Sequence, residues 1–230
     1  MMRFAPNLGR SVFILGGETV PYRELNMETY PRRDHFRFFT TMANPWTGLT
    51  VDIDVTDLMA WRERTGQPLF LLINYAVSRA ANAVPEFRRR IVGESIVEYD
   101  HCSTSHTEMR GDGSYGYCTL DDTDKTFAQY VPYAKARQEK VRLSTGLTEE
   151  GDMRSYLYIS CTPWVAFTHV IQPTPGQADS NPRIVWGKVF TREGRQYLPI
   201  NVLVHHAIVD GLHIAKFFEN LDREFAALCE

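Results

Sequence analysis

The sequence predicts a single α/β or α+β domain in which helices flank a mixed β-sheet. Helical and strand-like patterns follow one another along the chain without a strict β-α-β alternation, so a mixed sheet is expected. No repeat, low-complexity stretch or linker-like segment divides the 230 residues. With 43% hydrophobic residues, the chain can bury one sizeable core.

The N-terminal part differs from the rest in composition. Residues 1–28 are expected to form an irregular or strand-containing leader, and residues 29–230 a single domain. Prolines and glycines interrupt the leader repeatedly, at Pro6, Gly9, Gly16, Gly17 and Pro21.

The first elements of the domain follow from local patterns. Pro31 can open a helix that runs to Phe39. Residues 50–55 alternate apolar and polar side chains and include β-branched residues, which predicts a half-buried strand. Thr56 or Asp57 would then cap a short helix.

Three elements are expected in the middle of the chain. Residues 69–84 are apolar on most faces and end at a proline, which favours a buried helix over a strand. Residues 91–97 have apolar pairs on both sides of Gly93-Glu94, as a hairpin does. A helix is expected from about Thr126 to about Leu143.

The last third of the chain contains three strand patterns and one helix. The strands are expected at 156–160, 184–186 and 198–204, although Pro199 lies inside the third. The final helix has a predicted apolar face made of Leu212, Ile214, Phe217, Phe218, Leu221 and Phe225.

Charge and hydropathy exclude several classes of protein. The chain has 25 basic and 28 acidic residues, for a formal net charge of −3, and its only basic cluster is 88–90, so no nucleic-acid partner is predicted. The apolar run 12–15 is too short for a signal-peptide core or a membrane span. We therefore expect a cytoplasmic protein without a membrane partner.

The four cysteines give no metal or disulfide pattern. They are widely spaced without a Cys-x-x-Cys pair, so reduced and mostly buried thiols are expected. His101, Cys102 and His106 come nearest to a metal-binding set, but no second cluster completes a tetrahedron. No metal is predicted.

The stretch from His205 to Gly211 carries the clearest chemical signal. It joins an apolar strand to the final helix, a place where functional side chains are often presented on a rigid frame. Taken alone, it fits equally well a pair of packed histidines with Asp210 as a helix cap.

This stretch resembles the His-His-x-x-x-Asp-Gly motif of CoA-dependent acyltransferases. Four further segments are similar to the chloramphenicol acetyltransferase family: residues 30–36 (Tyr-Pro-Arg-Arg-Asp-His-Phe), 84–88 (Val-Pro-Glu-Phe-Arg), 160–168 (Ser-Cys-Thr-Pro-Trp-Val-Ala-Phe-Thr) and Gly187-Lys188. They follow the family's order over about residues 29 to 227. The resemblance implies the family's two-layer sandwich of sheet and helices.

The resemblance also implies a mechanism. His206 matches the general base, which takes the proton of an acceptor hydroxyl as that hydroxyl attacks the thioester of acetyl-CoA. Ser160 matches the donor that stabilises the tetrahedral oxyanion, and no acyl-enzyme forms. Asp210 and Arg32 match a structural pair that supports the site, and His205 is expected to be a packed partner.

Binding roles follow in the same way. The resemblance assigns Lys188 to the cofactor, and it assigns Phe39, Ser105 and Phe167 to the acceptor pocket, with core packing an equal alternative for Phe167. Ser105 stands where antibiotic-binding members have phenylalanine, and Val185 stands where the family usually has an auxiliary threonine. Both departures bear on the acceptor.

The implied protein is a homotrimer with its active sites between subunits. Acetyl-CoA would be a co-substrate with a small hydroxylated acceptor, chloramphenicol or a similar molecule, and no cofactor would be permanently bound. Two alternatives remain: an O- or N-acetyltransferase for another small metabolite, and a non-catalytic CoA-binding trimeric relative.

Overall fold

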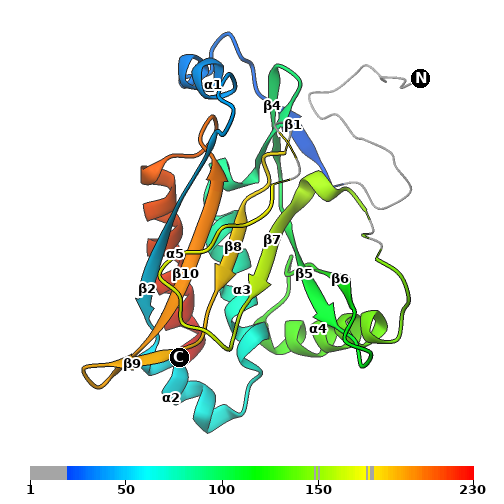
Figure 1. Ribbon diagram of the computed structural model, residues 1–230, viewed down its shortest axis with the longest axis vertical. Helices are drawn as coiled ribbons and strands as arrows, with labels where there is room; N and C mark the ends of the chain where they lie inside the picture. The colour runs from blue at the N-terminus through cyan, green and yellow to red at the C-terminus, as the bar shows by residue number, and fades with distance from the viewer. Residues whose placement is uncertain (1–19, 148, 150, 175, 177–178) are drawn as a thin grey trace.

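The computed structural model describes residues 20–147, 149, 151–174, 176 and 179–230. These residues form a seven-stranded sheet in the order β2-β10-β8-β7-β5-β6, with β9 paired to β10, and a three-stranded sheet in the order β1-β4-β3 (Figure 1). The strands are β1 (Tyr22–Glu24), β2 (Trp46–Asp54), β3 (Arg89–Val92), β4 (Ser95–Tyr99), β5 (Ser103–Met109), β6 (Tyr115–Leu120), β7 (Tyr156–Cys161), β8 (Arg183–Trp186), β9 (Phe190–Arg192) and β10 (Arg195–His205). The helices are α1 (Arg33–Phe39), α2 (Thr56–Thr65), α3 (Leu69–Asn82), α4 (Phe127–Arg142) and α5 (Gly211–Cys229), with 3₁₀ turns at Pro85–Arg88 and Met153–Ser155.

The large sheet is mixed, as the sequence predicts. β7 runs parallel to both β5 and β8, whereas β10 is antiparallel to β2 and β8. Within the described residues, no helix is both long enough and apolar enough to span a bilayer. The fold-class prediction of a mixed sheet flanked by helices is therefore confirmed.

The two faces of the large sheet have different environments. Alternate residues of β10 from Leu198 to Val204 are buried in the main core, which also contains Phe217 of α5 and Leu72 of α3. Residues 162–174 cross the other face, where Gln172 donates to Asn201 of β10 over 3.2 Å (Figure 1). We call this the second face of the sheet.

Most predicted elements are present with small shifts in their ends. The structure contains the predicted hairpin at 91–97 and the predicted helices that begin near 69, 126 and 211. It also contains the predicted strands near 50, 156, 184 and 198. Pro199 is accommodated inside β10, opposite Asp52 of β2. Residues 1–19 of the predicted leader lie outside the described residues, and β1 within the remainder pairs with β4.

Two local predictions are wrong. Neither Thr56 nor Asp57 caps α2, because the helix already begins at Thr56 and its N-cap position is Val55. Leu212 is not on the buried face of α5 but is 63% exposed. At 100° per residue, Leu212 is turned about 200° from Ile214, which is buried.

Three strands, β5, β6 and β9, were not expected from the pattern. β5 has the sequence Ser-Thr-Ser-His-Thr-Glu-Met, which has no run of apolar residues at every second position. Its interior side chains are buried through polar partners instead: Asn74 of α3 donates to the Thr104 hydroxyl over 2.9 Å. Tertiary hydrogen bonds therefore stabilise a strand that hydrophobic alternation does not mark.

Candidate active site

His206 lies at the point where β10 ends and the chain turns toward α5. Its backbone N–H donates to the Pro45 carbonyl over 2.8 Å, which ties the loop to the segment before β2. A cavity of about 550 Å³, lined in part by Pro45, Trp46, Ile171 and Leu203, opens beside this loop. His206 itself does not line this cavity, and the connection between them is Pro45, which lines it and accepts the His206 N–H.

The orientation of the His206 ring is set by a backbone carbonyl and an aromatic ring. Nδ1 is 3.2 Å from the Val209 oxygen, and because a carbonyl can only accept, we assign the ring proton to Nδ1. Phe39 stacks on the imidazole with centroids 4.0 Å apart and an interplanar angle of 16°. Nε2 is then the basic nitrogen of a half-buried ring held from two sides.

His205 occupies a different environment. Its side chain is buried, lies edge-on to Trp46 at 5.7 Å between centroids, and accepts from the Ala207 N–H through Nδ1 over 3.3 Å. Burial lowers the pKa of His205 to about 4, so the ring is neutral at physiological pH. The ring therefore packs between its neighbours as a neutral group.

Asp210 connects the loop after β10 to the start of α5 and to Arg32. It is the N-cap of α5, where its carboxylate accepts from the Leu212 N–H over 3.0 Å and its own N–H donates to His213 Nδ1 over 3.1 Å. The other carboxylate oxygen forms an ion pair with Arg32. Burial raises the pKa of Asp210, but Arg32 and the other partners outweigh this effect and hold it below its ordinary value.

Ser160 lies on the second face near the end of β7. Val185 of β8 is its register partner, and Asn201 of β10 is in turn level with Val185. The predicted threonine position is thus beside Ser160, but it holds a buried side chain that cannot donate a hydrogen bond.

The structure does not bring Ser160 and His206 together within one chain. His206 is five residues beyond Asn201, which at about 3.3 Å per residue is roughly 15 Å along the sheet. Ser160 is also two strands away from β10. The two side chains can act on one substrate only if a second copy of the chain supplies one of them.

The segment after Ser160 is tied to the Gly187-Lys188 pair. A Cβ on Gly187 would lie 2.7 Å from the Val165 oxygen and 3.0 Å from the Phe167 ring, so only glycine fits there. The Lys188 N–H donates to the same Val165 oxygen over 2.9 Å. The Lys188 side chain is exposed, and Phe167 is half-buried beside the glycine.

Several large apolar side chains of the crossing segment are exposed. Trp164 is 72% exposed, Val165 57% and Ile171 88%. Contiguous exposed apolar side chains of this size are typical of a surface that contacts another protein.

Ser105 has a partner that the sequence did not reveal. Its hydroxyl donates to one carboxylate oxygen of Glu149, and the Tyr158 hydroxyl donates to the other over 3.3 Å. Burial raises the pKa of Glu149 above its ordinary value, although the two hydroxyl donors oppose this effect. Glu149 lies in the connection from α4 to β7, where no motif marked it.

The set His101, Cys102 and His106 does not converge. The Cys102 sulfur is 3.5 Å from the Arg90 guanidinium. The His106 ring packs on Phe70, with centroids 4.6 Å apart. His101 points to Asp121 and Asp122 instead.

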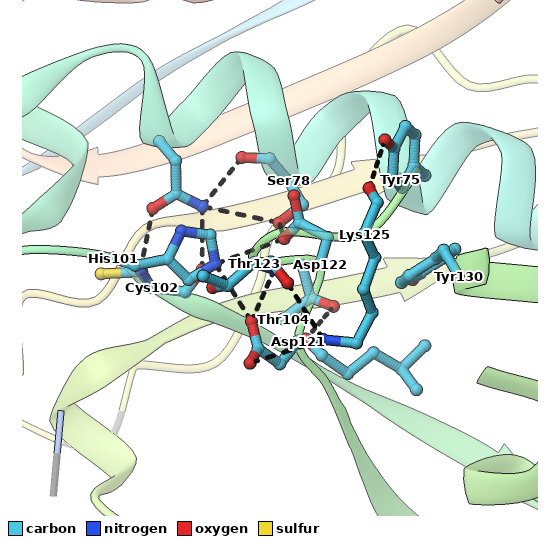
Figure 2. Close-up of polar contacts among 12 residues, drawn as sticks. Tyr75, Ser78, His101, Cys102, Thr104, Asp121, Asp122, Thr123, Lys125 and Tyr130 are labelled. Carbon is cyan, nitrogen blue, oxygen red and sulfur yellow. Dashed lines mark hydrogen bonds and ion pairs between the residues drawn. The ribbon is translucent and has the colours of Figure 1, made fainter. Parts of the chain in front are cut away.

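His101, Asp121 and Asp122 do place three donors within 4.8 Å of one another (Figure 2). His101 Nε2 is 3.3 Å from Asp122 and 3.5 Å from Asp121, Ser78 donates to Asp122, and the Lys125 ammonium is 3.9 Å from Asp121. Since both carboxylates already have cationic or hydrogen-bonding partners, we assign the cluster to joining α3 with the ends of β5 and β6.

Comparison with known proteins places this geometry in context. A family model described as chloramphenicol acetyltransferase matches residues 20–222. Chloramphenicol acetyltransferase 2 of Escherichia coli is 28% identical over 206 residues, 87% of this chain and 95% of that protein. A solved chloramphenicol acetyltransferase structure is 25% identical, with a TM-score of 0.76 over 89% of this chain and 99% of its own. A probable dihydrolipoamide acetyltransferase from Listeria monocytogenes shares the fold at 16% identity, with a TM-score of 0.63 over 86% of this chain and 93% of its own.

The pair of Arg32 and Asp210 gives a first prediction. Asparagine caps helices about as well as aspartate, so Asp210→Asn removes only the ion pair, whereas Asp210→Ala also removes the cap. Both variants should lose thermal stability and activity together, with Asp210→Ala lower by about a further 2–4 °C for about 1 kcal/mol of lost capping. Thermal unfolding followed by circular dichroism measures both.

The pH dependence of the difference provides the control. Because the folded pKa of Asp210 is depressed, the stability from its charge is complete at neutral pH and is lost as the pH falls through that pKa. The gap in Tm between wild type and Asp210→Asn should therefore close in acid. An unchanged Tm together with loss of the base pKa from the pH–rate profile would instead give Asp210 a role in proton transfer.

Proposed function

The chain belongs to the chloramphenicol acetyltransferase family, and from that premise we propose that it transfers an acetyl group from acetyl-CoA to a hydroxyl of chloramphenicol or a similar small acceptor. The observation that carries the proposal is the His206 ring, whose Nδ1–H is directed to a backbone carbonyl and whose Nε2 is left as a base. Acetyl-CoA is then a co-substrate, and no permanently bound cofactor is needed.

The chemistry assigned to His206 is general base catalysis. Nε2 takes the proton of the acceptor hydroxyl while its oxygen bonds to the thioester carbon, which gives a tetrahedral oxyanion. Collapse of this intermediate breaks the carbon–sulfur bond, and the imidazolium returns the proton to the departing CoA thiolate. The products are an acetyl ester and free CoA, with no acyl-enzyme.

We assign the oxyanion donor to Ser160 of a neighbouring subunit in a homotrimer. The separation of Ser160 and His206 within one chain supports this assignment, as do the exposed apolar residues Trp164 and Ile171. In a closed ring of three chains, every interface would place one His206 opposite one Ser160.

The remaining residues are assigned to binding. Phe39 holds the imidazole by stacking and can also present its edge to the acceptor. Phe167 lies close to Gly187 and can line the acceptor pocket. The exposed ammonium of Lys188 suits a phosphate of CoA.

A thiol-release assay with acetyl-CoA and a panel of acceptors, chloramphenicol included, tests the function. Turnover with chloramphenicol supports the assignment, and turnover only with other acceptors supports an O- or N-acetyltransferase for a different small metabolite. Ser105 and Val185 favour that second candidate, because both depart from the family's usual residue at positions near Ser160. CoA binding without any turnover would indicate a non-catalytic trimeric relative.

His206→Ala should lower kcat by several orders of magnitude and leave CoA binding nearly unchanged. The reason is that a general base acts in the transition state and contributes little to holding the substrates. Steady-state thiol release and calorimetric titration with CoA measure the two quantities. Substantial residual turnover would exclude His206 as the base.

Ser160→Ala should lower kcat about 10- to 1000-fold with little effect on KM, as loss of one oxyanion donor does. Ser160→Thr, which keeps a hydroxyl, is the matched control and should retain more activity than the alanine variant. A raised KM at unchanged kcat would make Ser160 a binding residue instead.

Mixed trimers test whether the site is shared. In a trimer assembled from both His206→Ala and Ser160→Ala chains, one of the three interfaces pairs an intact His206 with an intact Ser160. Each mixed trimer should therefore have roughly one third of wild-type activity, although each parent is nearly inactive. Activity no greater than that of the parents would place both residues in a site within one chain.

A further inference from the structure

Glu149, Ser105 and Tyr158 form a group on the second face of the sheet, on the same side as Ser160. Tyr158 is two residues before Ser160 on β7, so the two side chains share a face at a spacing of about 7 Å. Ser105 of β5 is the register partner of Tyr158, about 5 Å across the ladder. An acceptor that reacts between Ser160 and the His206 of a neighbouring chain can therefore reach this group with its far end.

The hydrogen bonds of this group leave acceptor capacity unused. The hydroxyls of Ser105 and Tyr158 each donate to Glu149, one to each carboxylate oxygen. An ionised carboxylate has about four acceptor positions, so two remain for a ligand. The single protons of the Ser105 and Tyr158 hydroxyls are both used in hydrogen bonds to Glu149. A ligand therefore finds hydrogen-bond acceptors in this group but no free hydroxyl donor.

The charge of Glu149 is also uncompensated. In the part of the chain that the structure describes, no Lys, Arg or His side chain forms an ion pair with it. Arg183, whose guanidinium lies over the Tyr158 ring, is paired with Asp179. A half-buried carboxylate without a cation is stabilised strongly when a ligand brings one.

We propose that Glu149, positioned by Ser105 and Tyr158, is a specificity-determining residue that selects acceptors carrying a cationic amine at the end remote from the reacting hydroxyl. This inference rests on the proposed function, which puts the reacting end of the acceptor beside Ser160. The acceptor class is a hydroxylated amine, and a nitroaryl group, which only accepts hydrogen bonds, is poorly matched to the carboxylate.

Three probes on one skeleton test the proposal: chloramphenicol, its analogue with an amine in place of the nitro group, and its analogue with an aminomethyl group there. At the end remote from the reacting hydroxyl, the nitro group only accepts hydrogen bonds, the aromatic amine is a neutral hydrogen-bond donor, and the aminomethyl group is a cation. For the wild type, kcat/KM should be about 10- to 100-fold higher for the aminomethyl probe than for chloramphenicol, because one charge-assisted hydrogen bond contributes about this factor. The difference should lie in KM, with kcat similar for the two probes.

Glu149→Gln should reverse this preference. The glutamine keeps the side-chain shape but has no charge, and its amide N–H can donate a hydrogen bond to the nitro group. The variant should therefore lose the higher kcat/KM for the aminomethyl probe and have a higher kcat/KM than the wild type for chloramphenicol. Glu219→Gln, which removes an exposed carboxylate of α5, is the matched control and should keep the wild-type order. An equal loss with all three probes would show a merely structural role, and equal kcat/KM for the amine and aminomethyl probes would exclude selection by charge.

Calorimetric binding of the same probes separates this inference from the proposed function. Preferential binding of the aminomethyl probe that Glu149→Gln abolishes, without thiol release from any probe, would support the role of Glu149 and refute acetyl transfer. Thiol release at equal kcat/KM from all three probes would support acetyl transfer and refute the role of Glu149.

Discussion

The pairing of β10 with β2 and β8 is the constraint on which the site depends. β10 is buried over most of its length, and its alternate residues fill the core against α3 and α5. A slip of one residue would turn this apolar set to the second face, so the register is strongly specified. The same register carries His206 past the end of the sheet and keeps Asn201 level with Ser160. The separation of the proposed base and the proposed oxyanion donor is therefore a property of the core. The proposed trimer is the means by which such a chain would complete the proposed site.

The backbone and aromatic packing orient His206, the proposed base. A carbonyl, the Val209 oxygen, receives the Nδ1 proton, and this carbonyl belongs to the loop that Asp210 closes as N-cap of α5. Arg32 reaches Asp210 from the segment before α1, and Phe39 from α1 covers the ring. Asp210 thus acts on His206 through the shape of the loop. This differs from a triad, in which a carboxylate binds the imidazole directly.

How much the sequence predicted depends on the kind of signal. Apolar periodicity located α3, α5, β7, β8 and β10, because each buries a continuous face. It failed at β5, a strand whose buried side chains are polar and are stabilised by partners distant in sequence, such as Asn74 with Thr104. The motif around His206 was visible because its residues are close together in the chain. Glu149 was not, because only the fold brings it to Ser105, 44 positions away.

The two proposals together separate catalysis from acceptor choice. His206 and Ser160 lie on β10 and β7, where changes would disturb the core and the register of the sheet. Glu149 comes from a connection between elements, and its main neighbour Ser105 is on β5, one strand further from the base. Connections tolerate substitution better than core strands do. On the proposed roles, a change from an apolar to a carboxylate-bearing wall would therefore alter which acceptors bind without moving His206 and Ser160. One catalytic frame would then accept molecules of opposite polarity.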